Sequence, residues 1–120
     1  MIAISGVKSI DFGTYDEVWY ITNYNPKMVV GAEHHPELSP FIGDYKNYRN
    51  NKISLSQLLQ NYGNALWSGK YEIPIKNLLK LSAEGAWIQL VCYCSNYTVC
   101  HRGVLYKYLK ELTDKVSLID

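Results

Sequence analysis

Hydrophobic residues change their spacing several times along the chain, and each spacing predicts a different element. Short runs of β-branched and aromatic residues at 2–10 and 17–23 predict two strands. A nearly continuous apolar run at 86–94, AWIQLVCYC, predicts a strand buried on both faces, as in the middle of a parallel or mixed sheet. Residues 116–119 predict a final edge strand.

Leucines at helical spacing predict three helices between these strands. Ser54 begins a capping box for the first helix. Pro74 stands in the first turn of the second helix, and Gly85 ends it. Thr98 is the expected cap of the third. Strands separated by helices predict one α/β domain over residues 1–120, with a small, mostly parallel or mixed sheet flanked by three or so helices in a compact, layered arrangement.

Residues 25–51 interrupt this alternation. The segment is rich in proline and has little periodicity, so it predicts a long irregular connection with about one helical turn. Connections of this length inside a compact domain are more often functional than idle. Glu33, His34 and His35 in this segment could exchange protons with a ligand, although solvated surface is the simpler interpretation.

Charge and composition limit the partners. The formal charge of +1 gives no global field for nucleic acid or for an anionic membrane, so any anion must be bound locally. No apolar run is long enough to span a bilayer, and the first residues lack the features of a signal peptide, so we expect a cytoplasmic protein. The eleven tyrosines suit a pocket that stacks on planar ligands, or simply a small core that uses Tyr in place of Phe.

All three cysteines lie in one stretch, VCYCSNYTVCHRG, at residues 91–103. An odd number of cysteines so close together argues for thiols or ligands rather than a disulfide framework. On a strand, Cys92 and Cys94 point to the same face. Cys100, His101 and Arg102 fall in the first turn of the next helix. The crevice beyond the carboxyl ends of the strands is the usual ligand site of an α/β sheet, and this stretch leads into it.

Three kinds of chemistry compete as interpretations of this stretch: a metal site, a thiolate nucleophile and an anion-binding site. Four zinc-competent side chains are present, but a Cys-x-Cys pair on one strand face separates its thiols too far for a zinc knuckle, so we expect neither a metal nor a cofactor. Cys100 or Cys94 could be a thiolate nucleophile beside His101. The helix N-terminus and Arg102 could instead cradle a phosphate or carboxylate. If the stretch has no functional role, the cysteines are simply small buried hydrophobic residues of the core.

The chain resembles domain of unknown function 488 in several of these segments. LVCYC followed by Cys100, His101 and Arg102 is similar to the family's C-terminal signature, and HHPELSP is similar to its Pro-x-Leu-x-Pro element. Tyr45, ISLSQLLQNYGNAL and WYITNYNP resemble the segments around it. Cys94 stands where the family has an acidic residue after the aromatic residue, which is Tyr93 here. The resulting Cys-aromatic-Cys, followed by Cys-His, is similar instead to domain of unknown function 4326. The resemblance implies an α/β fold with a pocket at the Cys-His-Arg helix, and no particular reaction.

These observations lead to three functional hypotheses. The first is a cytoplasmic domain that binds a nucleotide-like or other anionic small molecule, for example a phage or accessory protein that sequesters a signalling nucleotide. The second is an enzyme of nucleotide or nucleic-acid-related chemistry in which Cys100 or Cys94 is the nucleophile and His101 the base. The third is a protein-interaction module. A homo-oligomer is compatible with each of the three hypotheses. The expected ligand-binding residues are Arg102, His101, Cys94, Tyr97, Trp67, Tyr71, Glu33, His34 and Ser5.

Overall fold

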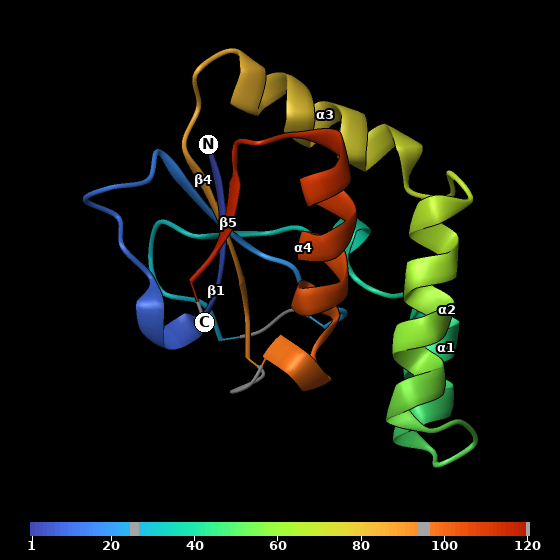
Figure 1. Ribbon diagram of the computed structural model, residues 1–120. Helices are drawn as coiled ribbons and strands as arrows, with labels where there is room; N and C mark the ends of the chain where they lie inside the picture. The colour runs from blue at the N-terminus through green and yellow to red at the C-terminus, as the bar shows by residue number, and fades with distance from the viewer. Residues whose placement is uncertain (25–26, 94–96, 120) are drawn as a thin grey trace.

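The computed structural model describes residues 1–24, 27–93 and 97–119, and they form an α/β fold around one parallel sheet (Figure 1). The strands stand in the order β3-β2-β4-β1-β5, and every pairing is parallel. Their bounds are Ile2–Gly6 for β1, Glu17–Tyr20 for β2, Glu33–His34 for β3, Ile88–Cys92 for β4 and Val116–Leu118 for β5. The expected fold class is therefore confirmed.

In the described part of the chain four α-helices connect the strands, three of them where the sequence predicted helices. Their bounds are Ile42–Arg49 for α1, Leu55–Trp67 for α2, Glu72–Ala83 for α3 and His101–Leu112 for α4. Ser54 caps α2, because its side chain accepts a hydrogen bond from the Gln57 amide. Gly85 follows α3 in the left-handed region, which favours glycine.

The predictions for residues 25–51 and for Thr98 were wrong. The segment contains β3, a 3-10 turn at Pro36–Leu38 and the two-turn helix α1. Helix α1 buries none of its residues, so its sequence shows no apolar face by which it could be found. Thr98 lies in another 3-10 turn, Tyr97–Val99, and Cys100 is the residue that precedes α4.

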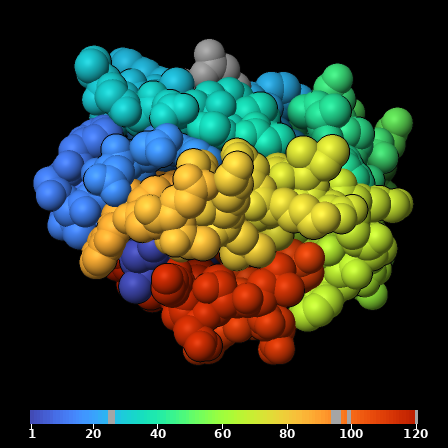
Figure 2. Space-filling view, turned by 90° about the horizontal axis from the view of Figure 1, so that it is seen from above, coloured from blue at the N-terminus to red at the C-terminus, as the bar shows by residue number. Residues whose placement is uncertain are grey.

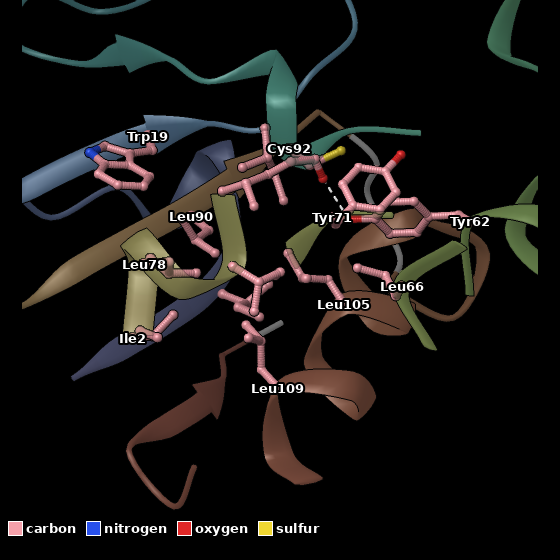
Figure 3. Close-up of a cluster of buried hydrophobic side chains, with 14 of the residues drawn as sticks. Ile2, Trp19, Tyr62, Leu66, Tyr71, Leu78, Leu90, Cys92, Leu105 and Leu109 are labelled. Atoms are coloured by element: carbon pink, nitrogen blue, oxygen red, sulfur yellow. Dashed lines mark hydrogen bonds between the residues drawn. The ribbon is translucent and has the colours of Figure 1, made fainter. Parts of the chain in front are cut away.

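The two faces of the sheet are covered differently. Helices α2, α3 and α4 lie on one side of it, whereas the β1–β2 connection lies on the other (Figure 1). The main core fills the helical side, where side chains of α2, α3 and α4 meet β1 and β4 (Figure 3). Seen from above, α3 lies between α4 and the stretch that contains the Pro36–Leu38 turn (Figure 2). Strand β4 is buried along its whole length, as its unbroken apolar run predicted.

The strand order creates a crevice between β2 and β4. After β2 the chain moves outward to β3, whereas after β4 it moves the other way, through α4 to β5. The two connections therefore leave neighbouring strands in opposite directions at the carboxyl edge of the sheet. Such a switch point leaves a gap in which ligands of α/β proteins commonly bind. None of the helices in the described part of the chain is long and apolar enough to cross a membrane.

Candidate functional site

Cys92, Cys100 and His101 come together at the carboxyl end of β4. Cys92 is the last residue of β4, Cys100 directly precedes α4, and His101 is the first residue of that helix. The two Sγ atoms are 3.1 Å apart, and His101 Nδ1 lies 3.9 Å from Cys92 Sγ and 3.8 Å from Cys100 Sγ. Both cysteines are buried, while His101 is partly exposed. The strand-turn-helix unit thus gathers three ligand or nucleophile atoms at one point.

His101 is held in a defined orientation. Its Nε2 lies 2.6 Å from the carbonyl oxygen of Ile21, just beyond β2. A carbonyl oxygen only accepts hydrogen bonds, so Nε2 carries a proton, and in the neutral form of the ring Nδ1 presents its lone pair to the two sulfurs. The edge of the ring meets Tyr62 at a centroid distance of 5.6 Å. Backbone of one strand and an aromatic side chain of α2 therefore fix the imidazole relative to the thiols.

Tyr62 is a buried, uncharged neighbour of the thiols and of His101. It is almost fully buried, and its hydroxyl donates a hydrogen bond to the Leu38 carbonyl. Burial, with smaller contributions from Tyr71 and the two cysteines, raises the pKa of Tyr62 well above its usual value. The phenol therefore stays protonated at neutral pH. Figure 3 shows Cys92 at the end of β4, beside Tyr62 and Tyr71.

A cavity of about 570 Å³ opens above this cluster, at the switch point between β2 and β4. Its floor is formed by Cys92, Cys100 and His101. Its walls come from the ends of β2 and β4 and from α1 and α2, through Thr22, Asn23, Tyr24, Pro40, Tyr45, Tyr48, Arg49, Leu55, Leu58, Leu59 and Tyr93. The volume falls in the range of small-molecule sites, and the lining combines apolar and aromatic surface with a few polar groups, as in such sites generally.

The charged side chain in the lining of the cavity is a cation, Arg49. Arg49 lies on its wall and also on the wall of a second hollow of about 420 Å³, which adds Lys46 and shares Tyr24 and Tyr45 with the first. Among the described residues, no aspartate or glutamate lines either hollow, and Arg49 takes part in none of the ion pairs. An anion bound where the two hollows meet would thus contact Arg49, lie near Lys46 and meet no carboxylate of the described residues.

The structure places the predicted residues of the cysteine stretch in three different settings. Cys100 and His101 line the cavity. Cys94 lies outside the described residues. Tyr97 is 42% exposed and does not line the cavity. Arg102 is the largest fully buried side chain of the described chain and does not line the cavity either, so a ligand in this cavity would not meet its guanidinium.

Three further predicted residues lie away from the cavity. Trp67 is 63% exposed at the end of α2 and packs edge-on against Tyr108. Tyr71 is buried and donates a hydrogen bond of 2.6 Å to the Ser39 carbonyl. Ser5 is fully buried in β1 and accepts a hydrogen bond from the side chain of Gln89. Tyr71 and Ser5 therefore hold the core together, and Trp67 belongs to the outer surface.

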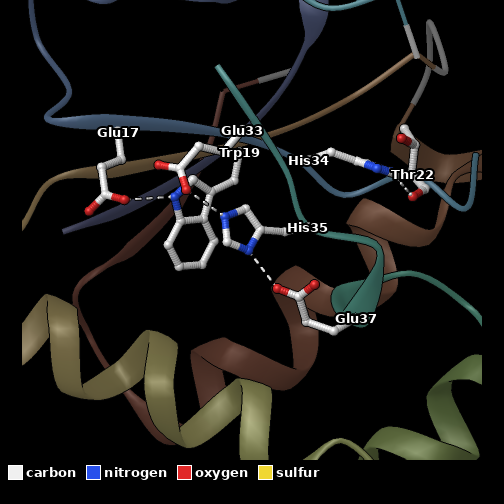
Figure 4. Close-up of polar contacts among 7 residues, drawn as sticks. All are labelled: Glu17, Trp19, Thr22, Glu33, His34, His35 and Glu37. Carbon is white, nitrogen blue, oxygen red and sulfur yellow. Dashed lines mark hydrogen bonds and ion pairs between the residues drawn. The ribbon is translucent and has the colours of Figure 1, made fainter. Parts of the chain in front are cut away.

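Glu33 and His34 lie at the edge of the sheet formed by β3 (Figure 4). His34 Nε2 is 2.7 Å from the carbonyl oxygen of Thr22, a residue of the cavity wall. Glu33 instead contacts His35, whose ring stacks on Trp19 at a centroid distance of 3.8 Å. Neither Glu33 nor His34 lines the cavity. His34 supports the wall through the backbone, and Glu33 belongs to a separate polar cluster.

Helix α1 supplies cavity-lining residues that were not among the predicted site residues. Tyr45, Tyr48 and Arg49 all line the cavity from this helix. Their spacing of three and four residues places them on one helical face, and this spacing was the available signal. It was hidden because the same segment has no apolar stripe and follows a proline-rich connection that contains Pro26, Pro36 and Pro40. The cavity residues of the β2–β3 connection, Asn23 and Tyr24, carry no comparable pattern.

The fold and the cavity together define an α/β protein with a parallel sheet and a ligand-sized site at its topological switch point. A comparison with protein families matches residues 16–113, more than half of the chain, to the family described as the active DUF488-N3 subclade. The chain belongs to this family, as the resemblance to domain of unknown function 488 predicted. No curated protein and no solved structure matches the chain.

Proposed function

We propose that the protein binds a planar, nucleotide-like or similar anionic small molecule in the cavity above Cys92, Cys100 and His101. The observation that supports this proposal most strongly is the lining of the cavity and its neighbouring hollow, which combines several tyrosines with two cations and includes no described carboxylate. Aromatic faces favour a planar group, and cations favour an anionic one. A nucleotide combines both features in one molecule.

In this proposal the anion is bound by Arg49 rather than by Arg102. Arg49 is exposed on α1, at the boundary between the two hollows, and Lys46 lies one turn earlier on the same helix. A guanidinium can hold a phosphate or carboxylate through two parallel hydrogen bonds. The two cations also offset the partial negative charge at the end of α1, which would be their role without a ligand.

The tyrosines would hold the planar part of the ligand. Tyr24 meets Tyr45 edge-on at a centroid distance of 5.4 Å, and Tyr45 is followed by Tyr48 at 6.4 Å. These rings come from two elements, the β2–β3 connection and α1. Stacking of a base on an aromatic ring contributes roughly 1–3 kcal/mol. The planar group would then lie over the apolar leucines of α2, with its anionic group toward Arg49.

Catalysis on the bound molecule is the second candidate function. Two observations favour it: thiols and an oriented imidazole form the cavity floor, and the family is described as an active subclade. Binding without chemistry would instead serve to sequester the ligand. Cys92 and Cys100 persist as neighbouring thiols most readily in a reducing compartment, so we propose a cytoplasmic location for either function.

Native mass spectrometry of the purified protein, followed by calorimetric titration with the four ribonucleoside monophosphates, tests the proposal. We expect either a retained small molecule or saturable binding of at least one nucleotide, and loss of that binding in Arg49→Ala. Lys107→Ala is the matched control, because Lys107 is exposed on α4 and lies outside both hollows. The absence of any bound or added ligand, or equal binding by Arg49→Ala and the wild type, would contradict the proposal. Turnover of the bound nucleotide would distinguish the enzyme from the sequestering protein.

A further inference from the structure

We propose that Cys92, Cys100 and His101 form a binding site for a single zinc ion, with its fourth coordination position open to the cavity. The Sγ atoms of both cysteines and the Nδ1 atom of His101 lie within 4.8 Å of one another. Two thiolates and an imidazole are ligands that zinc prefers. The two thiolates would also balance the charge of the ion, so the site needs no carboxylate.

The triangle of ligand atoms has nearly the size of one face of a zinc tetrahedron. Bonds of about 2.3 Å to sulfur and about 2.0–2.1 Å to nitrogen, at tetrahedral angles, separate two sulfurs by about 3.8 Å and a sulfur from the nitrogen by about 3.6 Å. The distances of 3.1, 3.9 and 3.8 Å differ from these values by about 0.7 Å or less. Small rotations about the cysteine χ1 angles are sufficient to close such differences.

The orientation of His101 supports the same conclusion. A metal-bound histidine usually donates its other ring N–H to a carbonyl or carboxylate, which fixes the tautomer and aims the ligand nitrogen. The Nε2 atom of His101 has such a partner in the Ile21 carbonyl at 2.6 Å. The ring edge is also packed against Tyr62. The lone pair of Nδ1 is thus aimed at the sulfurs before any metal arrives, which lowers the entropic cost of forming the site.

The sequence argument against zinc concerned a different pair of cysteines. Cys92 and Cys94 on one strand face would be too far apart, but the pair that meets in the structure is Cys92 with Cys100. Folding places α4 beside the end of β4 and brings these two thiols together. The objection based on spacing therefore does not apply to this site.

The open position makes this site more suitable for chemistry than for structural support. All three ligand residues line the cavity, and no fourth cysteine, histidine or carboxylate of the described residues joins their group, so the fourth position of a bound zinc would face the space in which the proposed ligand binds. A zinc site with three protein ligands keeps a water or substrate in that position, and the ion lowers the pKa of the water or polarises a bound oxygen. Zinc would therefore supply the reaction centre for the second candidate function. The inference deepens that function, but zinc binding itself does not depend on a nucleotide.

Titration with zinc alone tests the inference. The full chain, reduced and stripped of metal with a chelator, is titrated with Zn²⁺ in competition with a chromophoric indicator. We expect one ion per chain and release of the thiol protons into the buffer. Co²⁺ in place of zinc should give thiolate-to-metal charge-transfer bands and intense tetrahedral ligand-field bands. Both measurements use the wild-type protein, so they do not depend on the folding of a variant.

Variants then locate the site. Loss of an outer-shell partner costs roughly 10- to 100-fold in metal affinity, so Cys92→Ser, Cys100→Ser and His101→Ala should each weaken binding by roughly 100-fold or more. His35→Ala is the matched control, because this histidine lies in the separate polar cluster with Glu33 and should leave the affinity unchanged. Circular dichroism checks that each variant is folded.

Three results would overturn the inference. They are a wild-type protein that binds no stoichiometric zinc, a Co²⁺ spectrum without thiolate bands, and folded Cys100→Ser protein with wild-type affinity. Each of them leaves nucleotide binding intact, because Arg49 and the tyrosines do not contribute to the metal site. Conversely, tight zinc binding with no affinity for nucleotides would refute the proposed ligand and not the metal site.

Discussion

His101 Nε2 and the carbonyl oxygen of Ile21 are joined by a hydrogen bond of 2.6 Å that connects the start of α4 to the end of β2. The two residues are eighty positions apart in the sequence. This bond does two things at once: it closes the crevice between β2 and β4 at its base, and it sets which ring nitrogen faces the thiols. The position of the cavity and the chemistry of its floor therefore depend on the same contact.

Replacing His101 with alanine should destabilise the protein even when no metal is present. The change leaves the partly buried Ile21 carbonyl without this donor, and such a loss costs about 1–3 kcal/mol. Urea denaturation in the presence of a chelator measures the free energy of unfolding. Lys107→Ala on the exposed side of α4 serves as the control and should change it by less than about 0.5 kcal/mol. Equal stability of His101→Ala and the wild type would show that the bond does not form in solution.

Arg102→Ala and Arg49→Ala should separate structure from binding. Arg102 is fully buried, so truncating it removes a large packed side chain and should lower the free energy of unfolding by about 2 kcal/mol or more. Arg49 is exposed, so its truncation should change stability by less than about 0.5 kcal/mol while removing affinity for an anionic ligand. Denaturation and ligand titration on both variants measure the two effects. A stable Arg102→Ala variant that had lost ligand binding would restore Arg102 as the anion anchor.

Gly103→Ala should disturb the floor of the cavity. A Cβ atom at Gly103 would overlap the carbonyl oxygen of Tyr97, which accepts a hydrogen bond from the Cys100 amide. The 3-10 turn before α4 would have to move, at a cost of about 1–3 kcal/mol, and Cys100 would move with it. The measurement is thermal or urea denaturation.

Gly43→Ala is the matched control for Gly103→Ala. No atom lies within 4 Å of a Cβ placed at Gly43 in α1, and alanine favours a helix over glycine by up to about 1 kcal/mol. Gly43→Ala should therefore leave stability unchanged or raise it. If Gly103→Ala also raised stability, the turn at Tyr97 would not be packed against α4 as the structure shows.

Tyr71→Phe should change how stability depends on alkaline pH. Burial, with a smaller contribution from Asp44, raises the pKa of Tyr71 in the folded protein above its usual value of about 10. The buried phenol therefore makes its full contribution to the free energy of unfolding below about pH 10. This contribution is lost as the pH rises above about 10, since only the unfolded chain then releases the proton. Tyr71→Phe should be about 1 kcal/mol less stable than the wild type at neutral pH, because the bond to Ser39 is lost.

The difference in the free energy of unfolding between Tyr71→Phe and the wild type should then shrink at about pH 11. At this pH the unfolded wild-type chain ionises at position 71, which destabilises the folded wild type, whereas phenylalanine has no proton to lose. Urea denaturation at both pH values measures it. Tyr97→Phe, at an exposed tyrosine, should behave as the wild type throughout. A constant difference across the pH range would show that the Tyr71 phenol is not buried from solvent.

The amino-acid sequence by itself determined the elements that have strong local patterns. The continuous apolar run of β4, the Ser54 cap of α2 and the glycine after α3 each have a physical signature within a few residues, and each was predicted. The placement of Cys100 and His101 at the start of α4 was also predicted, because a strand, a short turn and a leucine-patterned helix follow one another there.

Tertiary structure alone decided what surrounds those residues. The meeting of Cys92 with Cys100, the burial of Arg102 and the use of α1 as a cavity wall depend on the strand order β3-β2-β4-β1-β5, which no local pattern encodes. Helix α1 is a clear case: it buries no residue, so its position follows from its packing beside α2 rather than from an apolar stripe of its own. Local spacing fixes which side chains share a face of an element, but only long-range packing fixes which faces meet.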